Sequence, residues 1–433
     1  MNARNQKKAI AKLLKKAIKS FLKEDFELVH QYLDELQSKN LDSKSKKRLK
    51  KVLLLFMLGE LYGINTMHGI LEIAGAKSNN YQRIWQKYSC QQIMNLALGL
   101  FSKVLENRLI ELSDKTESTW SRGKVTIILD GSVFKQWLEQ EPFGQYYAKH
   151  FSGQTHKVEY GFNLLLLGVA IGDEFYPLYF HILCKGKQEK VKGISCKLLT
   201  KCSLYLTKLS KTHQLTYGKL YVSVDSGFRY DALIAYCQYA GWEPIIACEK
   251  AHIFTICSWK GKLRDYIKEV YEKQEKAHQS KYAEQGKTAP PYVLRIKADY
   301  RAMGRKVLLV FFRINNSKKV SVVFTTDLGA KAKTIRHRFF QRVKIEQFFR
   351  FVKHTLKIQQ STSKNFLGFL KKVALFFLKA IFCQIFTKKT QKWSKKLKLL
   401  GYERIRRLII HNLDNRPLEE LVTNGTFCMN FNL

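Results

Sequence analysis

The chain is poor in acidic residues and lacks the patterns that mark secreted proteins. It has 35 Asp and Glu residues against 76 Lys and Arg residues, which gives a formal net charge of +41. Its nine cysteines are scattered and never form a Cys-x-x-Cys pair. Neither a disulfide framework nor a zinc finger is therefore indicated, and reduced thiols of this kind are typical of a cytoplasmic protein.

Uninterrupted apolar runs are also missing. The N-terminal segment MNARNQKKAIAKLLKKAIKSFL is basic throughout and has no apolar centre, so we do not expect a secretory signal there. The longest apolar stretch, residues 366–386, contains Lys371, Lys372 and Lys379, which makes a membrane span costly. We expect this stretch to be a buried amphipathic helix, and we expect the protein to have no membrane partner.

Positive charge is what the sequence has in abundance, and it is spread along the whole chain. Hydrophobic residues make up 45% and aromatic residues 13%, which is enough to bury a core and excludes a disordered chain. Since a folded chain with this much self-repulsion normally meets a polyanion, nucleic acid is the first candidate partner. A nucleotide bias that enriches lysine without any function is one alternative, and an anionic membrane surface is a weaker one.

The pattern along the chain predicts a mixed α/β protein in five parts. Residues 1–118 are expected to be helical and to bind DNA ends, although the spacing fits a plain helical bundle as well as a helix-turn-helix. Short β-rich runs alternate with helical patterns over 119–251, which is typical of a mixed sheet flanked by helices. A β-rich insertion with a long polar helix follows over 252–328. Helices return over 329–390, and a helical tail is predicted over 391–433.

Two aspartates follow apolar runs that are typical of central strands. Asp130 comes directly after the run 125–129, and Asp225 comes directly after the run 220–224. We expect both residues to end their strands, at the positions where open α/β sheets bind ligands. An aspartate at a strand end is also common as a turn former or a helix N-cap, so either residue alone is ambiguous.

A third carboxylate lies on a helix predicted over residues 334–357. Phe339, Arg342, Glu346 and Lys353 are separated by 3, 4 and 7 positions, which places all four on one face at about 100° per residue. An apolar set on a neighbouring face is predicted to dock this helix on the sheet: Ile345, Phe348, Phe349, Val352 and Leu356. The alternative is a surface ladder of charged pairs without a catalytic role.

Carboxylates from two strand ends and one helix suit phosphoryl transfer with two metal ions. Hard cations such as Mg²⁺ prefer oxygen ligands, and two ions roughly 4 Å apart activate the attacking oxygen and stabilise the leaving one. We therefore predict that Asp130, Asp225 and Glu346 hold two Mg²⁺ ions, for which Mn²⁺ can substitute. Arg342 and Lys353 are predicted to bind adjacent DNA phosphates.

The helix motif resembles a known signature. Arg342-x3-Glu346-x6-Lys353, with an aromatic residue three positions before the arginine, is similar to the Y-x2-R-x3-E-x6-K signature of DDE transposases of the insertion-sequence-four (IS-four) type. This motif is fairly specific.

Three shorter motifs extend the resemblance to roughly residues 120–360. Asp225-Ser226-Gly227-Phe228 is similar to the family's second aspartate motif, and Asp130-Gly131-Ser132 stands where the first belongs. Thr325-Thr326-Asp327 resembles the run that leads to the family's catalytic glutamate.

The resemblance implies an RNase H-like fold with a β-rich insertion before Glu346. It implies a transposase of a prokaryotic insertion sequence, cytoplasmic and associated with the nucleoid, that cleaves the element ends and joins their 3′-hydroxyls to target DNA. Asp130, Asp225 and Glu346 are then the catalytic residues, and Phe339, Arg342 and Lys353 contact DNA. The implied partners are double-stranded DNA, both terminal inverted repeats and target, and a second copy of the chain. A metal-dependent nuclease without strand transfer and an inactivated basic DNA-binding protein are the alternatives.

Two departures from the family pattern leave open whether this copy is active. The family's tyrosine is Phe339 here, so the phenolic hydrogen bond to phosphate is lost while the ring is expected to remain for stacking. No tryptophan occurs between Trp259 and Trp393, so a base flipped against the insertion needs another aromatic residue. The candidates are Tyr300, Phe311 and Phe312.

Overall fold

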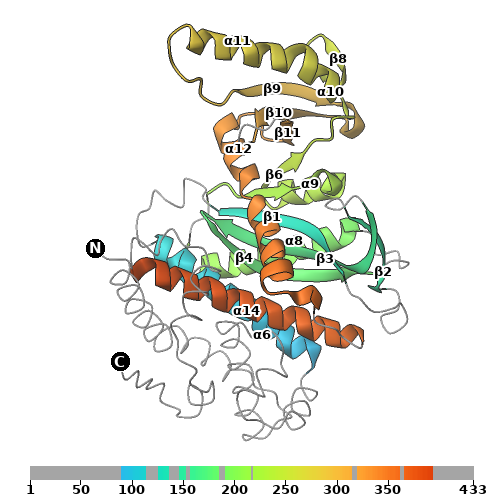
Figure 1. Cartoon of the computed structure of the whole chain (residues 1–433), viewed down its shortest axis with the longest axis vertical. Helices are drawn as coiled ribbons and strands as arrows, with labels where there is room; N and C mark the ends of the chain where they lie inside the picture. The colour runs from blue at the N-terminus through green and yellow to red at the C-terminus, as the bar shows by residue number, and fades with distance from the viewer. Residues whose placement is uncertain are drawn as a thin grey trace, which may run out of the picture.

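The computed structural model describes residues 89–113, 125–135, 146–152, 157–184, 191–215, 218–314, 319–360 and 365–393. These residues form one 11-stranded sheet with helices on both faces (Figure 1). The helix α6 (Cys90–Ser113) agrees with the helical prediction for the N-terminal part. The rest of that part, residues 1–88 and 114–118, and the predicted tail beyond residue 393 lie outside the described residues.

The inner half of the sheet contains the two predicted aspartate strands. Its strands are β1 (Val125–Lys135), β2 (Ala148–Ser152), β3 (Lys157–Ile171), β4 (Glu174–Leu183), β5 (Tyr221–Val224) and β6 (Glu243–Ala247). Strand β3 pairs antiparallel with β1, β2 and β4, whereas β5 lies parallel to both β1 and β6. Antiparallel strands followed by a parallel series agree with the mixed, RNase H-like sheet that the sequence predicted.

The outer half of the sheet consists of the strands from residues 252–328. These are β7 (Ile253–Ile256), β8 (Trp259–Lys262), β9 (Val293–Tyr300), β10 (Arg305–Arg313) and β11 (Val320–Thr325). They follow β6 in the order β11, β10, β9, β7 and β8, and every pairing among them is antiparallel. Because β11 hydrogen-bonds directly to β6, these β-rich residues extend the inner sheet rather than form a sheet of their own (Figure 1).

Helices cover the two faces of the sheet differently. One face is covered by α8 (Val191–His213), α9 (Asp231–Tyr239), α10 (Leu263–Tyr266) and α11 (Glu272–Ala283). The other face carries α12 (Ala332–Phe340) and α13 (Val343–Arg350), followed by the π-helix η6 (Phe351–Thr355). Within the described part of the chain, no helix combines the length and apolar character needed to cross a bilayer.

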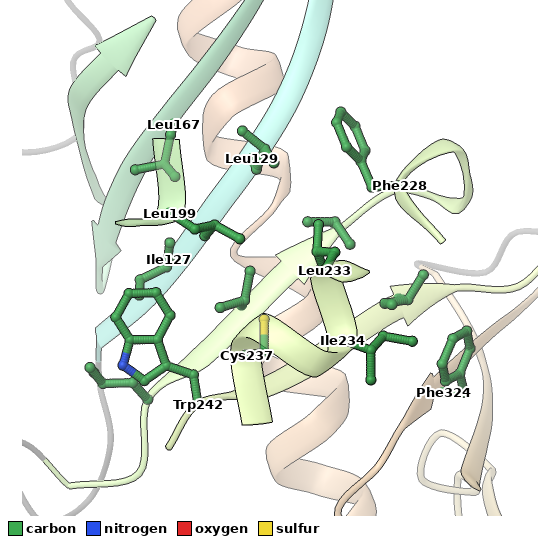
Figure 2. Packing of buried hydrophobic residues seen from close by; sticks show 14 of the residues in the cluster. Ile127, Leu129, Leu167, Leu199, Phe228, Leu233, Ile234, Cys237, Trp242 and Phe324 are labelled. Carbon is green, nitrogen blue, oxygen red and sulfur yellow. The ribbon is translucent and has the colours of Figure 1, made fainter. Parts of the chain in front are cut away.

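The alternation of side chains along the strands decides which residues face α12 and α13. Ile127 and Leu129 of β1 pack in the large cluster beneath α8 and α9, together with Leu233 and Trp242 (Figure 2). Since successive side chains of a strand point to opposite faces, Asp130 lies on the α13 side of the sheet. A slip by one residue would turn the Asp130 carboxylate into the hydrophobic cluster beneath α8 and α9, where an unpaired charge is costly, so packing fixes this register.

The buried helix predicted over residues 366–386 is present as α14 (Phe366–Trp393), which packs against α6. It is less amphipathic than predicted, because the side chains of Lys372 and Lys379 are buried along with the apolar ones. Burial lowers the pKa of Lys372 to about 7.

Candidate active site

Asp130 and Asp225 lie next to each other where the parallel pair β1–β5 ends. Leu129 and Val224 form the last paired step between these strands, so the two aspartates are the next residue on each strand. Asp225 ends its strand as predicted, and its carboxylate accepts a hydrogen bond from the backbone N–H of Ser226 at 2.8 Å. The prediction that Asp130 also ends its strand is wrong, because β1 continues to Lys135 through its pairing with β3.

The helix predicted over residues 334–357 is broken in the structure. α12 ends at Phe340, Gln341 and Arg342 form a turn, and α13 begins at Val343. The reason is that the two helices dock in different places, α12 against β5, β6, β9 and β10, and α13 against β1 and β4. The four motif residues therefore do not share one straight helix face, although the predicted apolar set is buried as expected: Ile345, Phe348, Phe349, Val352 and Leu356.

Arg342, at the break, is the point where the three carboxylates meet. Its guanidinium nitrogens lie 2.6 Å from Glu346, 3.2 Å from Asp130 and 4.0 Å from Asp225. The side chains of Arg342 and Asp130 are 17% and 13% exposed, so this pair interacts with little screening by water. Asp225 and Glu346 are 49% and 40% exposed, so their interactions with Arg342 are weakened by solvent. The structure thus brings the acidic residues predicted from two strands and one helix together around one cation.

The donor set has the chemistry that suits a divalent cation. All three side chains offer hard carboxylate oxygens, and they already share one positive charge. Among the described residues, no three acidic, histidine or cysteine side chains lie close enough together to chelate a metal ion directly. The carboxylate ligands are therefore of the type that Mg²⁺ prefers. In this structure they surround the guanidinium of Arg342 instead of forming a chelating cluster.

Asp130 is the most perturbed of the three carboxylates. Burial raises its pKa from 3.8 to about 6, and the nearby charges of Asp225 and Glu346 act in the same direction. The guanidinium of Arg342 and the backbone N–H of Gly131, at 2.8 Å, oppose this rise. A carboxylate perturbed by burial and by specific charged neighbours is a physical indication of a functional site.

Lys353 lies beside the carboxylates rather than among them. Its ammonium donates a hydrogen bond to Oγ of Ser132 at 2.7 Å and lies 5.0 Å from the centre of the Phe134 ring. Burial lowers the pKa of Lys353 to about 8. Ser132 is on the same face of β1 as Asp130 and two residues farther along, so the lysine is anchored roughly 7 Å along the strand from that carboxylate.

Phe339 supports Arg342 from within the protein. Its ring is buried in the smaller hydrophobic cluster and contacts Phe312 edge to face at 6.0 Å, while the Arg342 guanidinium lies 5.6 Å above it. The structure therefore places this ring in the core beneath the arginine, and a contact of Phe339 with DNA stays a prediction.

The aromatic residues proposed for stacking a flipped base are not accessible. Tyr300, Phe311 and Phe312 are each 0% exposed, because they face the hydrophobic clusters on the two sides of the outer sheet. That prediction is wrong for this structure.

The Thr325-Thr326-Asp327 run leads away from the carboxylates, because β11 is antiparallel to β6, and Asp327 lies at the opposite end of the strands. Asp327 accepts a hydrogen bond from Lys219 at 2.7 Å, and Thr326 donates one to Glu243 at 3.1 Å. These two hydrogen bonds fix the start of the segment that connects β11 to α12.

The sequence assigned no role to two polar side chains that support the site. Ser132 is the hydrogen-bond partner of Lys353, and its position two residues after Asp130 on a strand was the available signal. Arg338 is 3% exposed beneath α12 and donates a hydrogen bond to Thr126 at 3.2 Å. Nothing in the sequence distinguishes this buried arginine from the exposed basic residues around it.

Comparison with known proteins adds one finding. No curated protein has a sequence that matches this chain. A family model covers less than half of the chain, including Asp225 and Glu346 but not Asp130. Residues 198–380 match this model, which is described as the transposase DDE domain.

Proposed function

We propose that this protein is a DNA transposase of the insertion-sequence-four type, which cleaves element ends and joins them to target DNA. The observation that carries the proposal is the meeting of Asp130, Asp225 and Glu346 around Arg342, where the parallel strands β1 and β5 end. The match of residues 198–380 to the transposase DDE domain supports it independently.

The proposed roles of the side chains follow from their positions. Asp130, Asp225 and Glu346 would hold two Mg²⁺ ions, which when bound activate the attacking oxygen and stabilise the leaving one. With a pKa of about 6, Asp130 is ionised at neutral pH and available as an oxygen donor. Arg342 and Lys353 offer two positive charges beside the carboxylates, where they bind neighbouring DNA phosphates.

The proposed reaction has two phosphoryl transfers. In the first, a water oxygen bonds to the phosphorus at an element end, the bond to the 3′-oxygen breaks, and that oxygen takes up a proton. In the second, the freed 3′-hydroxyl loses its proton and bonds to a target phosphorus, from which another 3′-oxygen leaves. Because the two ends of an element are cut in concert, we propose that a homodimer acts on the terminal inverted repeats.

Replacement of single carboxylates tests the proposal. Asp130→Ala, Asp225→Ala and Glu346→Ala are each expected to slow Mg²⁺-dependent strand cleavage by roughly 10³-fold, which corresponds to about 4 kcal/mol of transition-state stabilisation. Binding of DNA in a gel-shift assay should survive all three changes. Asp173→Ala is the matched control, because this carboxylate is fully exposed in the turn between β3 and β4.

The outcomes separate the candidate functions. Full cleavage by any one of the three variants contradicts the assignment of catalytic residues. Wild-type protein that nicks DNA with Mg²⁺ or Mn²⁺ but never joins a pre-cut end to a target is a nuclease. Wild-type protein that binds DNA but cleaves with neither metal is an inactivated DNA-binding protein. Short inverted repeats on both sides of the reading frame would favour transposition over both.

A further inference from the structure

One face of the outer half of the sheet is covered by α10 and the helical segment that leads into α11. The other face, which we call the open side, is covered only in part, by α12 against β9 and β10. Phe254, Tyr300 and Phe311 pack in the large cluster with α10 and the helical segment that leads into α11. The opposite positions of the same strands carry exposed cations. These are Lys260, Lys262, Arg295, Lys297 and Lys306, which we call the outer basic face.

Strand register shows that the outer basic face is the same side of the sheet as the carboxylates. Residues paired across neighbouring strands lie on one face. One such row of paired residues crosses the sheet from β1 to β9: Ile128, Ser223, Ile245, Thr325, Leu308 and Lys297. Asp130 is two residues beyond Ile128 and therefore on this side too. The row makes five steps of about 4.8 Å, so Lys297 lies roughly 24 Å from β1.

The charge of the outer basic face is largely uncompensated. Within the described residues, Lys260, Lys262, Lys297 and Lys306 form no ion pair, and the one acidic strand residue on this face is Asp299. Lysines elsewhere in or next to the sheet do have carboxylate partners: Lys135 of β1 contacts Glu159 at 2.5 Å, and Lys219, just before β5, contacts Asp327 at 2.7 Å. Cations held on one face without counter-charges repel one another, and an external polyanion relieves that repulsion.

The covered side of the outer half has a different charge pattern. The lysines of α11 and the turn after it alternate with Glu272, Glu275 and Glu284, so positive and negative charges are mixed. A compositional excess of lysine alone would enrich both sides to the same degree. The concentration of unbalanced cations on the open side is therefore a feature of the fold.

The spacing of the cations suits a phosphate backbone. Residues two apart on a strand, such as Lys260 and Lys262, are separated by about 7 Å. Phosphates along one DNA strand rise by about 3.4 Å of helix axis each, and because the strand also winds around the axis, neighbouring phosphates are separated by a distance similar to that between the cations.

We propose that the outer basic face binds the backbone of duplex DNA that extends from the carboxylate site. At 3.4 Å per base pair, the path of roughly 24 Å places this contact about seven base pairs from the cut. The inference rests on the proposed function for one point, that the bound DNA leads to the carboxylates. That this face binds DNA at all is argued from its exposed charges and from the strand register that places them on one side. Because phosphates carry no sequence information, the contact contributes affinity and alignment rather than recognition of a sequence.

A salt titration with matched variants of the full chain tests the proposal. The test variant combines Lys260→Gln, Lys262→Gln, Lys297→Gln and Lys306→Gln, which leaves Arg295 in place because it donates a hydrogen bond to the carbonyl of Leu328. The control variant removes the same number of charges from exposed positions on the other side: Lys273→Gln, Lys276→Gln, Lys281→Gln and Lys287→Gln. Circular dichroism and urea unfolding check that both variants fold as the wild type does.

The expected result is a difference in the slope of log K against log[salt] for duplex DNA of arbitrary sequence. The test variant should lose about 0.9 of slope per phosphate contact, roughly 3 to 4 in all, and the control variant less than about 1. Equal slopes for the two variants overturn the proposal. An equal loss of binding to single-stranded RNA or to heparin contradicts duplex DNA as the partner.

A cleavage assay of the wild type in Mg²⁺, run in parallel, separates this inference from the proposed function. If the wild type cleaves DNA and the test variant binds DNA as the wild type does, the proposal that the outer basic face binds DNA is overturned, and the transposase assignment stands. A lost slope without any wild-type cleavage supports the face and contradicts the transposase assignment.

Discussion

The carboxylate site and the outer basic face lie on the same side of one sheet, but they handle charge in opposite ways. At the site, Asp130 is buried, and three acids share the single guanidinium of Arg342. On the outer basic face, the lysines are exposed to solvent and form no ion pairs within the described residues. Charges in a low-dielectric setting interact strongly and depend on one another, whereas exposed charges act weakly and nearly additively. The coupled charges of the carboxylate site suit catalysis, and the independent charges of the outer basic face suit binding to a long polyanion.

After loss of a carboxylate, the largest expected effect comes from removing the shared cation of the site. Arg342→Gln should slow strand cleavage by roughly 10²- to 10³-fold, because a positive charge held in place beside the reacting phosphate is lost. Single-turnover cleavage at saturating Mg²⁺ measures this effect. Lys344→Gln is the control, since its ammonium pairs with the fully exposed Asp173 at 2.8 Å. Wild-type rates for Arg342→Gln would show that the convergence of charges has no catalytic role.

Packing, rather than charge, should hold α13 in place. Ile345 is 0% exposed, and its replacement by Ala should lower the free energy of unfolding by about 2–4 kcal/mol through lost burial and a cavity. Urea unfolding measures the change. Val343→Ala on the same helix is the control, because Val343 is 37% exposed and should contribute less than about 0.5 kcal/mol. Similar losses from both replacements would mean that the helix is not docked as described.

The buried charge of Asp130 should make stability depend on pH. Its folded-state pKa of about 6 lies above the ordinary 3.8, so between these values the folded state keeps a proton that the unfolded state has released. Wild-type stability should therefore fall as pH rises from about 4 to about 6. Asp130→Asn lacks this loss, so its stability relative to wild type should increase over that window by on the order of 1–3 kcal/mol.

For Asp173, the expected dependence of stability on pH has the opposite sign, so Asp173→Asn is the comparison for this experiment. The hydrogen bond and charge of Lys344 lower the pKa of Asp173, so its contribution to stability appears as pH rises and disappears as pH falls. Urea midpoints in metal-free buffer from pH 4 to pH 7 measure both trends. Parallel curves for Asp130→Asn and wild type would contradict the burial of the Asp130 charge.

The smallest effect is expected on the outer basic face. Lys297→Gln should change the free energy of unfolding by less than about 0.5 kcal/mol, because an exposed side chain without an ion pair is replaced. The salt slope of DNA binding should nevertheless fall by about 1. A stability loss as large as that of Ile345→Ala would place Lys297 in the packing of the fold rather than on a binding surface.

Much of the sheet was predictable because its strands carry local signals. The short β-rich runs predicted over 119–251 form β1 to β6, and the β-rich residues predicted over 252–328 form β7 to β11. Each combines β-branched or aromatic residues with a clear end, and no distant contact is needed to recognise it. The pairing of β11 with β6 was not predictable in this way, because it joins strands far apart in the sequence.

The site was predictable in its residues but not in its geometry. Spacing identified Glu346 and Arg342, whereas the break between α12 and α13 depends on where two separate helices dock. Asp130 was expected at a strand end because its apolar run stops there, yet pairing with β3 continues the strand. In both cases a long-range contact overrides the local pattern. The burial of Phe339 likewise follows from its contact with Phe312 across the insertion.

The unbroken ladder of strands from β1 to β9 gives the protein a built-in ruler. Backbone hydrogen bonds, rather than a linker, set the separation between Asp130 and Lys297. In the proposed complex, DNA bound at Lys297 is presented to the carboxylates at a fixed offset, so the distance from the bound segment to the cut is set in whole strand widths.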